Sequence, residues 1–280
     1  MKKVTKISEK ITEVFYPSLS DVMQDINKYK NRTDDAHIRD MLDKAKGYST
    51  FYYFDTFPEA ESALLKGDWE LGKMALNNKF ILENKNFEDK KKQKMFYDVV
   101  GFQASVPRYL QGLPTNMINS RPVQKQEKTI TIVKHIGYIG DVTAAEIIES
   151  SAKALTILNQ IEKMGIRCNL DIYSPASDPD VYGNYGNIRI RIKNATERLA
   201  IGQLAFPLAN PDMLRRFIFG LRGANRLEGV WDIFRHYSRS EYDISTNKKF
   251  LEAVGIKNCI FLNNFMNSPE AELKRNGLIK

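Results

Sequence analysis

Three residues with acid–base side chains occur within seven positions: His135, Tyr138 and Asp141. Side chains of these types can accept, donate and relay a proton when they lie within hydrogen-bond reach. They follow an apolar segment that ends at residue 133, and the carboxyl ends of strands are where open α/β sheets bind ligands. The sequence therefore indicates a candidate ligand loop at 135–141. No partner motif accompanies these residues, so an ordinary turn before the next helix is the stronger interpretation.

Other catalytic and metal-binding patterns are missing from the sequence. Gly137 and Gly140 are not followed by the Gly-Lys-Ser/Thr of a phosphate loop, and no serine stands in a Gly-x-Ser-x-Gly elbow. The three histidines are dispersed, and the two cysteines form no Cys-x-x-Cys pair. We therefore expect no metal, no cofactor and no catalytic residue, although an enzyme with its site at the 135–141 loop stays open as a minor alternative. We expect both cysteines to be buried free thiols in strands.

A cationic strand is the sharpest basic feature of the chain. Arg189, Arg191 and Lys193 alternate with three isoleucines, and strict alternation would place the three cations on one face of a strand. That face could contact the phosphates of a nucleic acid. Tyr182 and Tyr185 in the preceding segment could stack on its bases. Cations also protect the edge of a sheet from pairing with another chain, and this alternative accounts for the same residues.

A second basic region begins at Arg215 and Arg216 and continues to Arg239. It is interleaved with Trp231, Phe234 and other aromatic residues. The arginine fork pairs with phosphate or carboxylate, so nucleic-acid contacts are one interpretation. Acidic residues in the same stretch make internal ion pairs or a subunit contact an equal alternative, because Arg and aromatic side chains dominate protein interfaces.

The elements that must position these residues form an α/β pattern. A strand over 129–133 precedes a helix that Thr143 and Glu146 open with a capping box and that Gly165 ends. Strands at 168–173 and 188–193 follow with no helix between them, which predicts antiparallel neighbours. Further elements are a helix at 197–206 ended by Pro207, a helix capped at residue 210, a strand at 256–262 and a helix from residue 268. We predict an α/β fold with a Rossmann-like sheet and one antiparallel edge strand.

The first 95 residues read as helical. Helices are expected from Ser20, over 34–47, over 58–67 and from Trp69 onward. The charged stretch 89–94 then reads as a connection between domains. These patterns predict a helical N-terminal region at 1–95 and an α/β domain at 96–280.

The order strand, helix, strand, antiparallel strand, helices, strand resembles the start of von Willebrand factor A-type domains over Thr129–Asn264. Members of that family bind metal through Asp-x-Ser-x-Ser directly after the first strand, where this chain has His135, Gly137 and Ile139. The family's later acidic position falls near Asn263 and Asn264. The resemblance therefore implies an A-type scaffold with a degenerate metal site.

The segment Ser105–Gly112, with Pro114, Met117 and Ile118 after it and residues 162–167 later, is similar to a group of uncharacterised bacteriophage proteins. This resemblance implies a phage origin and expression in the cytoplasm of a bacterial host, with virion association left open. It implies no catalytic residues.

Charge and hydropathy narrow the functional class. The chain has 42 basic and 34 acidic residues, a net charge of +8, and this excess favours either an acidic or phosphate-bearing partner or simply a lysine-rich soluble exterior. It has no run of 18 apolar residues and no apolar leader, so we expect a soluble protein without membrane contact. Our leading hypothesis is a non-enzymatic, phage-encoded interaction or assembly protein that binds a protein or nucleoprotein partner, with a homo-oligomer left open. The alternative is a nucleic-acid-binding protein that uses the basic strand face.

Overall fold

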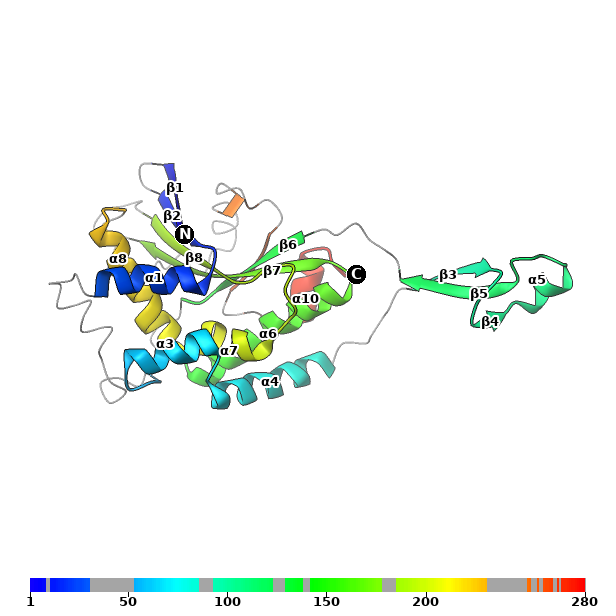
Figure 1. Ribbon diagram of the computed structural model, residues 1–280, viewed down its shortest axis with the longest axis horizontal. Coiled ribbons are helices and arrows are strands. Elements are labelled where there is room, and N and C mark those ends of the chain that lie inside the picture. The colour runs from blue at the N-terminus through cyan, green and yellow to red at the C-terminus, as the bar shows by residue number, and fades with distance from the viewer. Residues whose placement is uncertain are drawn as a thin grey trace.

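The computed structural model of the 280-residue chain describes residues 1–8, 11–30, 53–85, 93–122, 129–137, 142–177, 185–230, 251–252, 256, 259–263, 266 and 268–279. The predicted helix at 34–47 lies outside these ranges. A six-stranded sheet with its helices forms what we call the body, and a three-stranded sheet forms a separate projection (Figure 1).

The body sheet has the strand order β1-β2-β8-β7-β6-β9. Its strands are β1 (Lys3–Ser8), β2 (Ile11–Tyr16), β6 (Thr129–His135), β7 (Arg167–Ser177), β8 (Tyr185–Lys193) and β9 (Cys259–Leu262). β6 runs parallel to β7 and β9, β2 runs parallel to β8, and the pairs β7–β8 and β1–β2 are antiparallel. The predicted α/β class and the antiparallel pairing of β7 with β8 are confirmed.

Two details of the predicted sheet are wrong. β8 is not an edge strand, because β2 pairs along its other side from Ile11 to Tyr16. The first residues of the chain are strands rather than helices. The sequence of β2 does not alternate simply between apolar and polar residues, because both faces of the strand are buried. Val14 and Tyr16 pack in the main core, and Glu13 is buried on the opposite face.

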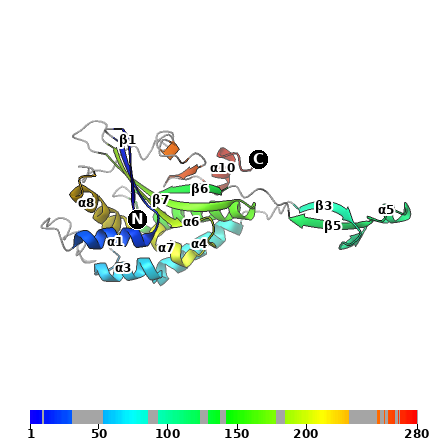
Figure 2. The same cartoon turned by 45° about the horizontal axis from the view of Figure 1, so that its top comes forward.

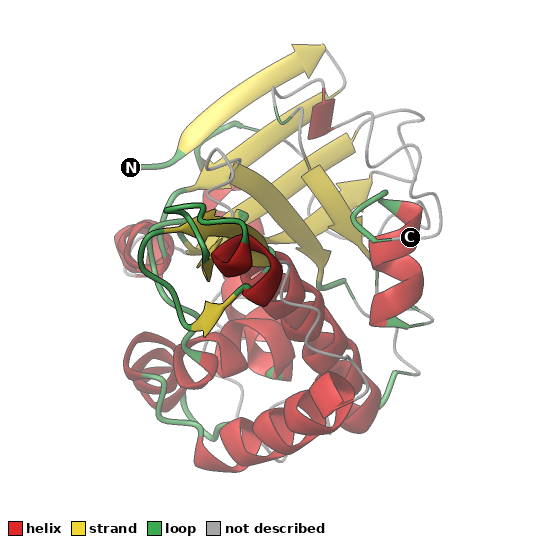
Figure 3. Ribbon diagram, turned by 90° about the vertical axis from the view of Figure 1, so that its right-hand side faces the viewer, coloured by secondary structure: helices red, strands yellow, loops and turns green. Residues whose placement is uncertain are grey.

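Most helices gather on one side of the sheet (Figure 3). They are α1 (Leu19–Lys30), α3 (Phe57–Lys66), α4 (Glu70–Lys85), α6 (Ala144–Lys163), α7 (Ile201–Ala209), the π-helix η1 (Met213–Ile218), α8 (Phe219–Leu227) and α10 (Pro269–Arg275). The predicted capping box of α6 is present, with Thr143 and Glu146 each bonded to the backbone of the other. The predicted cap of α10 at Ser268 is also present.

One predicted helix end is wrong. Pro207 lies inside α7, which continues to Ala209. Proline in a helix interior removes one backbone hydrogen bond, but the turn that contains it is packed in the core, with Phe206 and Leu208 almost fully buried. Burial of these apolar side chains outweighs the lost bond. Asn210 then takes its predicted cap position and accepts a hydrogen bond from the backbone of Asp212.

A single main core joins the helices to one sheet face. It includes Val14 and Leu76 from before residue 95 and Leu155 and Ile190 from after it, so the predicted division into 1–95 and 96–280 does not separate two hydrophobic cores. A smaller cluster on the opposite sheet face contains Val133, Tyr173, Leu251, Cys259 and Phe261. No helix within the described ranges is long and apolar enough to cross a membrane.

The second sheet belongs to residues 93–122, which we call the arm. It consists of β3 (Gln93–Asp98), β4 (Gln103–Ala104), the short helix α5 (Val106–Leu110) and β5 (Met117–Pro122), with the strand order β3-β5-β4. β3 begins at Gln93, inside the charged stretch 89–94 that was predicted to connect two domains. Figures 1 and 2 show the arm extending away from the body, with α5 at its far end.

Candidate protein-interaction surface

The candidate ligand loop does not assemble an acid–base set in the described part of the chain. His135 ends β6 and is 1% exposed, with its ring 6.2 Å from that of Tyr173 and 6.4 Å from that of Phe261. Burial, and then the charges of Lys134 and Arg222, lower the pKa of His135 to about 3. Its surroundings therefore favour the neutral imidazole at physiological pH. Tyr138 and Asp141 lie outside the described residues.

The neighbouring residue Lys134 was not singled out by the sequence analysis, although it occupies the same end of β6. Its Nζ donates to the backbone carbonyl of His135 at 2.9 Å and to that of Asn263, just after β9, at 3.4 Å. It links the carboxyl ends of two parallel strands. Lys134 is fully buried, and this burial lowers its pKa to about 7. Lysine is rarely buried, so no signal in the sequence distinguishes it from a surface residue.

The predicted cationic face of β8 is turned into the protein. The guanidinium of Arg189 donates to Glu13 of β2 at 2.8 Å and to Asp171 of β7 at 2.5 Å, and it lies 3.9 Å from the ring centre of Phe15. Arg191 also pairs with Asp171. Burial alone would lower the pKa of Arg189, but the hydrogen bond to Glu13 and the charges of Glu13 and Asp171 raise it overall. These arginines bind carboxylates of the sheet rather than presenting themselves to phosphates.

Lys193 does not share a face with Arg189 and Arg191. The pairing of β7 with β8 shifts register between Leu170 and Asp171, so that Lys193 pairs with Leu170, whose side chain belongs to the main core. A bulge of this kind interrupts the alternation of side chains. The Nζ of Lys193 donates to Glu162 of α6 at 2.7 Å and to the carbonyl of Cys168 at 3.1 Å. Simple alternation could not predict this change of side.

The second basic region is also largely internal where it is described. Arg216 is fully buried and donates to the carbonyl of Phe54 at 2.7 Å, with Asp212 at 3.7 Å. Arg215 is partly exposed, and its guanidinium lies 5.6 Å from the ring centre of Phe219. Tyr182 lies outside the described residues, and Tyr185 is described only as the first backbone position of β8.

The described ranges contain two buried thiols and no cluster of potential metal ligands. Cys168 and Cys259 are free and buried, as predicted, and burial raises the pKa of Cys168 to about 12. A thiol with such a pKa is not a nucleophile at neutral pH. The described residues contain no group of three or more His, Cys, Asp or Glu side chains that could hold a metal ion.

Within the described residues, a group of exposed large apolar side chains lies at the end of the arm, in Val99–Leu113, which we call the tip. Their exposure ranges from 62% at Val99 to 78% at Leu110. The exposed apolar residues of the tip are Val99, Val100, Phe102, Val106, Tyr109 and Leu110. Soluble proteins rarely expose so many large apolar side chains together, and such patches mark interaction sites. Sequence reasoning missed this surface, although the run Val99, Val100, Gly101, Phe102 was a signal for it.

The tip is an ordered structure rather than a loose loop. Arg108 of α5 donates to the carbonyl and the hydroxyl of Thr115, at 2.9 and 3.0 Å, and its guanidinium lies 4.3 Å from the ring centre of Tyr97. A Cβ at Gly101 would lie 2.2 Å from the carbonyl oxygen of Ile118, so the turn from β3 to β4 requires glycine. These contacts hold α5 at the end of the sheet and keep its apolar side chains outward.

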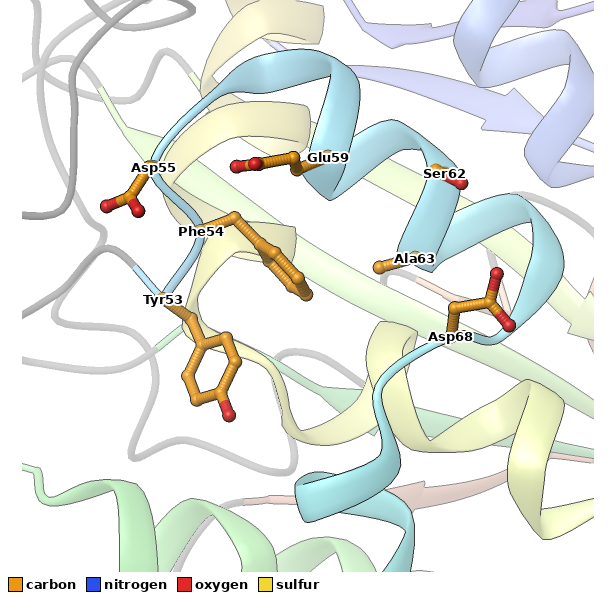
Figure 4. A pocket seen from close by; sticks show the side chains of 7 residues that line it. All are labelled: Tyr53, Phe54, Asp55, Glu59, Ser62, Ala63 and Asp68. Atoms are coloured by element: carbon orange, nitrogen blue, oxygen red, sulfur yellow. The ribbon is translucent and has the colours of Figure 1, made fainter.

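A pocket of about 450 Å³ lies on the body, beside α3. It is lined by Tyr53, Phe54, Asp55, Glu59, Ser62, Ala63 and Asp68. Figure 4 shows the ring of Phe54 pointing toward Ala63, with Asp55 and Asp68 at opposite ends. The buried carboxylate of Asp212 holds this segment in place by accepting hydrogen bonds from the backbone of Tyr53 and Phe54, at 3.0 and 2.9 Å.

Comparison with known proteins identifies a family whose function is unknown. No curated protein and no solved structure matches the chain. A family model described as "Domain of unknown function (DUF7192)" matches residues 2–267, which include both the body sheet and the arm. This chain therefore belongs to the DUF7192 family.

Proposed function

We propose that this chain is a non-enzymatic interaction protein that binds a protein partner through the apolar tip of its arm. The observation that carries the proposal is the exposure of Val100, Phe102, Tyr109 and Leu110 on an ordered projection. Covering apolar surface contributes roughly 25 cal/mol per Å², so each large side chain that becomes buried adds on the order of 1–2 kcal/mol to binding. An ordered tip also loses little conformational entropy when it docks.

The chemistry of the tip favours protein over nucleic acid. Arg108 is the one charged residue in the sequence between Val99 and Leu113, whereas binding to nucleic acid depends on several cations that displace counterions. Arg189, Lys193 and Arg216, which the alternative hypothesis needed at the surface, are nearly fully buried. The partner should present an apolar surface of its own.

The finer identity of the protein rests on resemblance. The order β8-β7-β6-β9 with β8 antiparallel supports an A-type scaffold, and we retain a degenerate A-type domain as part of the proposal. The segment similar to phage proteins, Ser105–Gly112, is the segment that forms the end of the arm. This coincidence supports an assembly role for a phage-encoded protein, located in the bacterial cytoplasm or on the virion.

Site-specific photo-crosslinking tests the proposed function. A photoreactive phenylalanine analogue at Tyr109, in cells that naturally make the protein, should give a discrete protein adduct, because this side chain would be covered by the partner. The adduct should lose most of its intensity when Leu110→Asp is added, and its yield should change little from low to high salt. Mass spectrometry of the adduct identifies the partner.

The matched control places the same photoreactive group at Arg198, an exposed residue of the body. It should give no discrete adduct. Equal adducts from both positions, or none from Tyr109, would exclude the tip as the binding surface. Crosslinks to nucleic acid that vanish at high salt would instead favour the nucleic-acid alternative.

A further inference from the structure

We propose further that the partner of the tip is a second copy of this chain, which receives the tip at the pocket beside α3. This inference rests on the proposed function, because it assigns an occupant to the same apolar tip.

The pocket has an apolar part, and exposed apolar residues follow its last lining residue in the sequence. Phe54 and Ala63 line it, and Leu71, three residues after the lining residue Asp68, is 71% exposed at the start of α4. Met74 is also exposed and follows one helical turn later. We call the pocket together with Leu71 and Met74 the acceptor surface. A pocket of about 450 Å³ has room for one or two large side chains of the size of Tyr109 or Leu110.

The two surfaces have opposite charge. Three acidic residues, Asp55, Glu59 and Asp68, are among the described residues that line the pocket, and no basic residue is among them. This acidic rim stands out in a chain whose net charge is +8. The charge of the tip is that of Arg108, whose guanidinium is held by a carbonyl, a hydroxyl and an aromatic ring, all of them neutral groups. Its positive charge is thus available to attract the acidic rim.

The tip and the acceptor surface lie in different places on the molecule. In both views the end of the arm is far from α3 (Figures 1 and 2), so the tip of one copy meets the acceptor surface of another. When two copies form one such contact, one tip and one acceptor surface stay free, so further copies can add and build rings or filaments. A small contact of this kind gives weak, concentration-dependent association.

Sedimentation velocity on the full chain tests this inference. The natural protein should form species larger than a dimer as its concentration rises. A tip variant, Tyr109→Asp/Leu110→Asp, places acidic groups against the acidic rim, and an acceptor variant, Asp68→Lys/Leu71→Lys, removes both acid and apolar surface. Each should weaken self-association by at least ~10-fold. All four positions are exposed, so folding should be retained, which circular dichroism checks.

Mixing the two variants gives the sharpest result. The tip variant keeps a working acceptor surface and the acceptor variant keeps a working tip, so an equal mixture should form a dimer and stop there. Arg198→Asp, a charge change elsewhere on the body, should assemble like the natural protein. A natural chain that stays monomeric, or variants whose mixture stays monomeric, overturns the inference.

The outcomes also separate this inference from the proposed function. A Tyr109 crosslink to another protein, with a monomeric natural chain, leaves the interaction function standing and overturns self-docking. Absence of any Tyr109 crosslink overturns both. Self-assembly that the tip variant abolishes and the acceptor variant leaves unchanged overturns the assignment of the acceptor surface.

Discussion

Arg189→Ala should lower the free energy of unfolding by roughly 3–5 kcal/mol, because removal of one partner leaves buried charge without its counterpart. Glu13 and Asp171 are 2% and 0% exposed, and both bind Arg189. In the variant Asp171 keeps Arg191, whereas Glu13 keeps the longer contact with the amide of Asn187 at 3.4 Å. The loss therefore falls mainly on the pairing of β2 with β8. Urea denaturation of both proteins measures the difference.

Arg167→Ala is the matched control, since Arg167 is an exposed arginine on the adjacent strand β7. It should change the free energy of unfolding by no more than about 0.5 kcal/mol. Equal effects of the two substitutions would show that the ion-pair network contributes no stability. The expected result also bears on binding experiments, because charge reversal at Arg189 and Arg191 would unfold the sheet, and lost nucleic-acid binding in such a variant would not identify a phosphate contact.

Lys134→Met should stabilise the protein, and the gain should depend on pH. The pKa of Lys134 is about 7 in the folded protein against an ordinary value of 10.5, because burial disfavours the ammonium. Below pH 7 both states hold the proton, and the folded state bears the full cost of a buried charge. Between pH 7 and 10.5 the unfolded state binds more proton, so the stability of the natural protein rises with pH. The advantage of methionine should therefore be greatest below pH 7 and decline above it.

The interval between the pKa of Lys134 in the folded protein and its ordinary value sets the size of this pH dependence. Each pH unit between the two pKa values corresponds to ~1.4 kcal/mol, so the gain from Lys134→Met should be roughly 3 kcal/mol larger near pH 6 than near pH 9.5. The carbonyls of His135 and Asn263 lose a donor in the variant, which offsets part of the gain at every pH. Thermal denaturation at the two pH values measures the difference.

Lys79→Met, at an exposed lysine of α4, should show the same small effect at both pH values. A gain from Lys134→Met that is independent of pH would mean that Lys134 is charged in the folded protein throughout this range. The ammonium of Lys134 would then be a permanent positive charge at the carboxyl ends of β6 and β9.

The sequence by itself determined the local elements of this protein. The capping box of Thr143 and Glu146, the stop at Gly165 and the cap at Ser268 lie where they were predicted, because each depends on hydrogen bonds among residues only a few positions apart. The α/β class and the antiparallel pairing of β7 with β8 followed from the order and spacing of those elements.

Only the tertiary structure decided which side chains face solvent. Arg189 pairs with Glu13, 176 positions away, once β2 lies beside β8, and one bulge moves Lys193 to the opposite face of the sheet. Arg189 and Lys193, which the alternation of β8 predicted at the surface, are thus buried, whereas Tyr109 and Leu110 form the exposed end of the arm. Burial depends on which distant segments meet, and local propensity carries no information about that meeting.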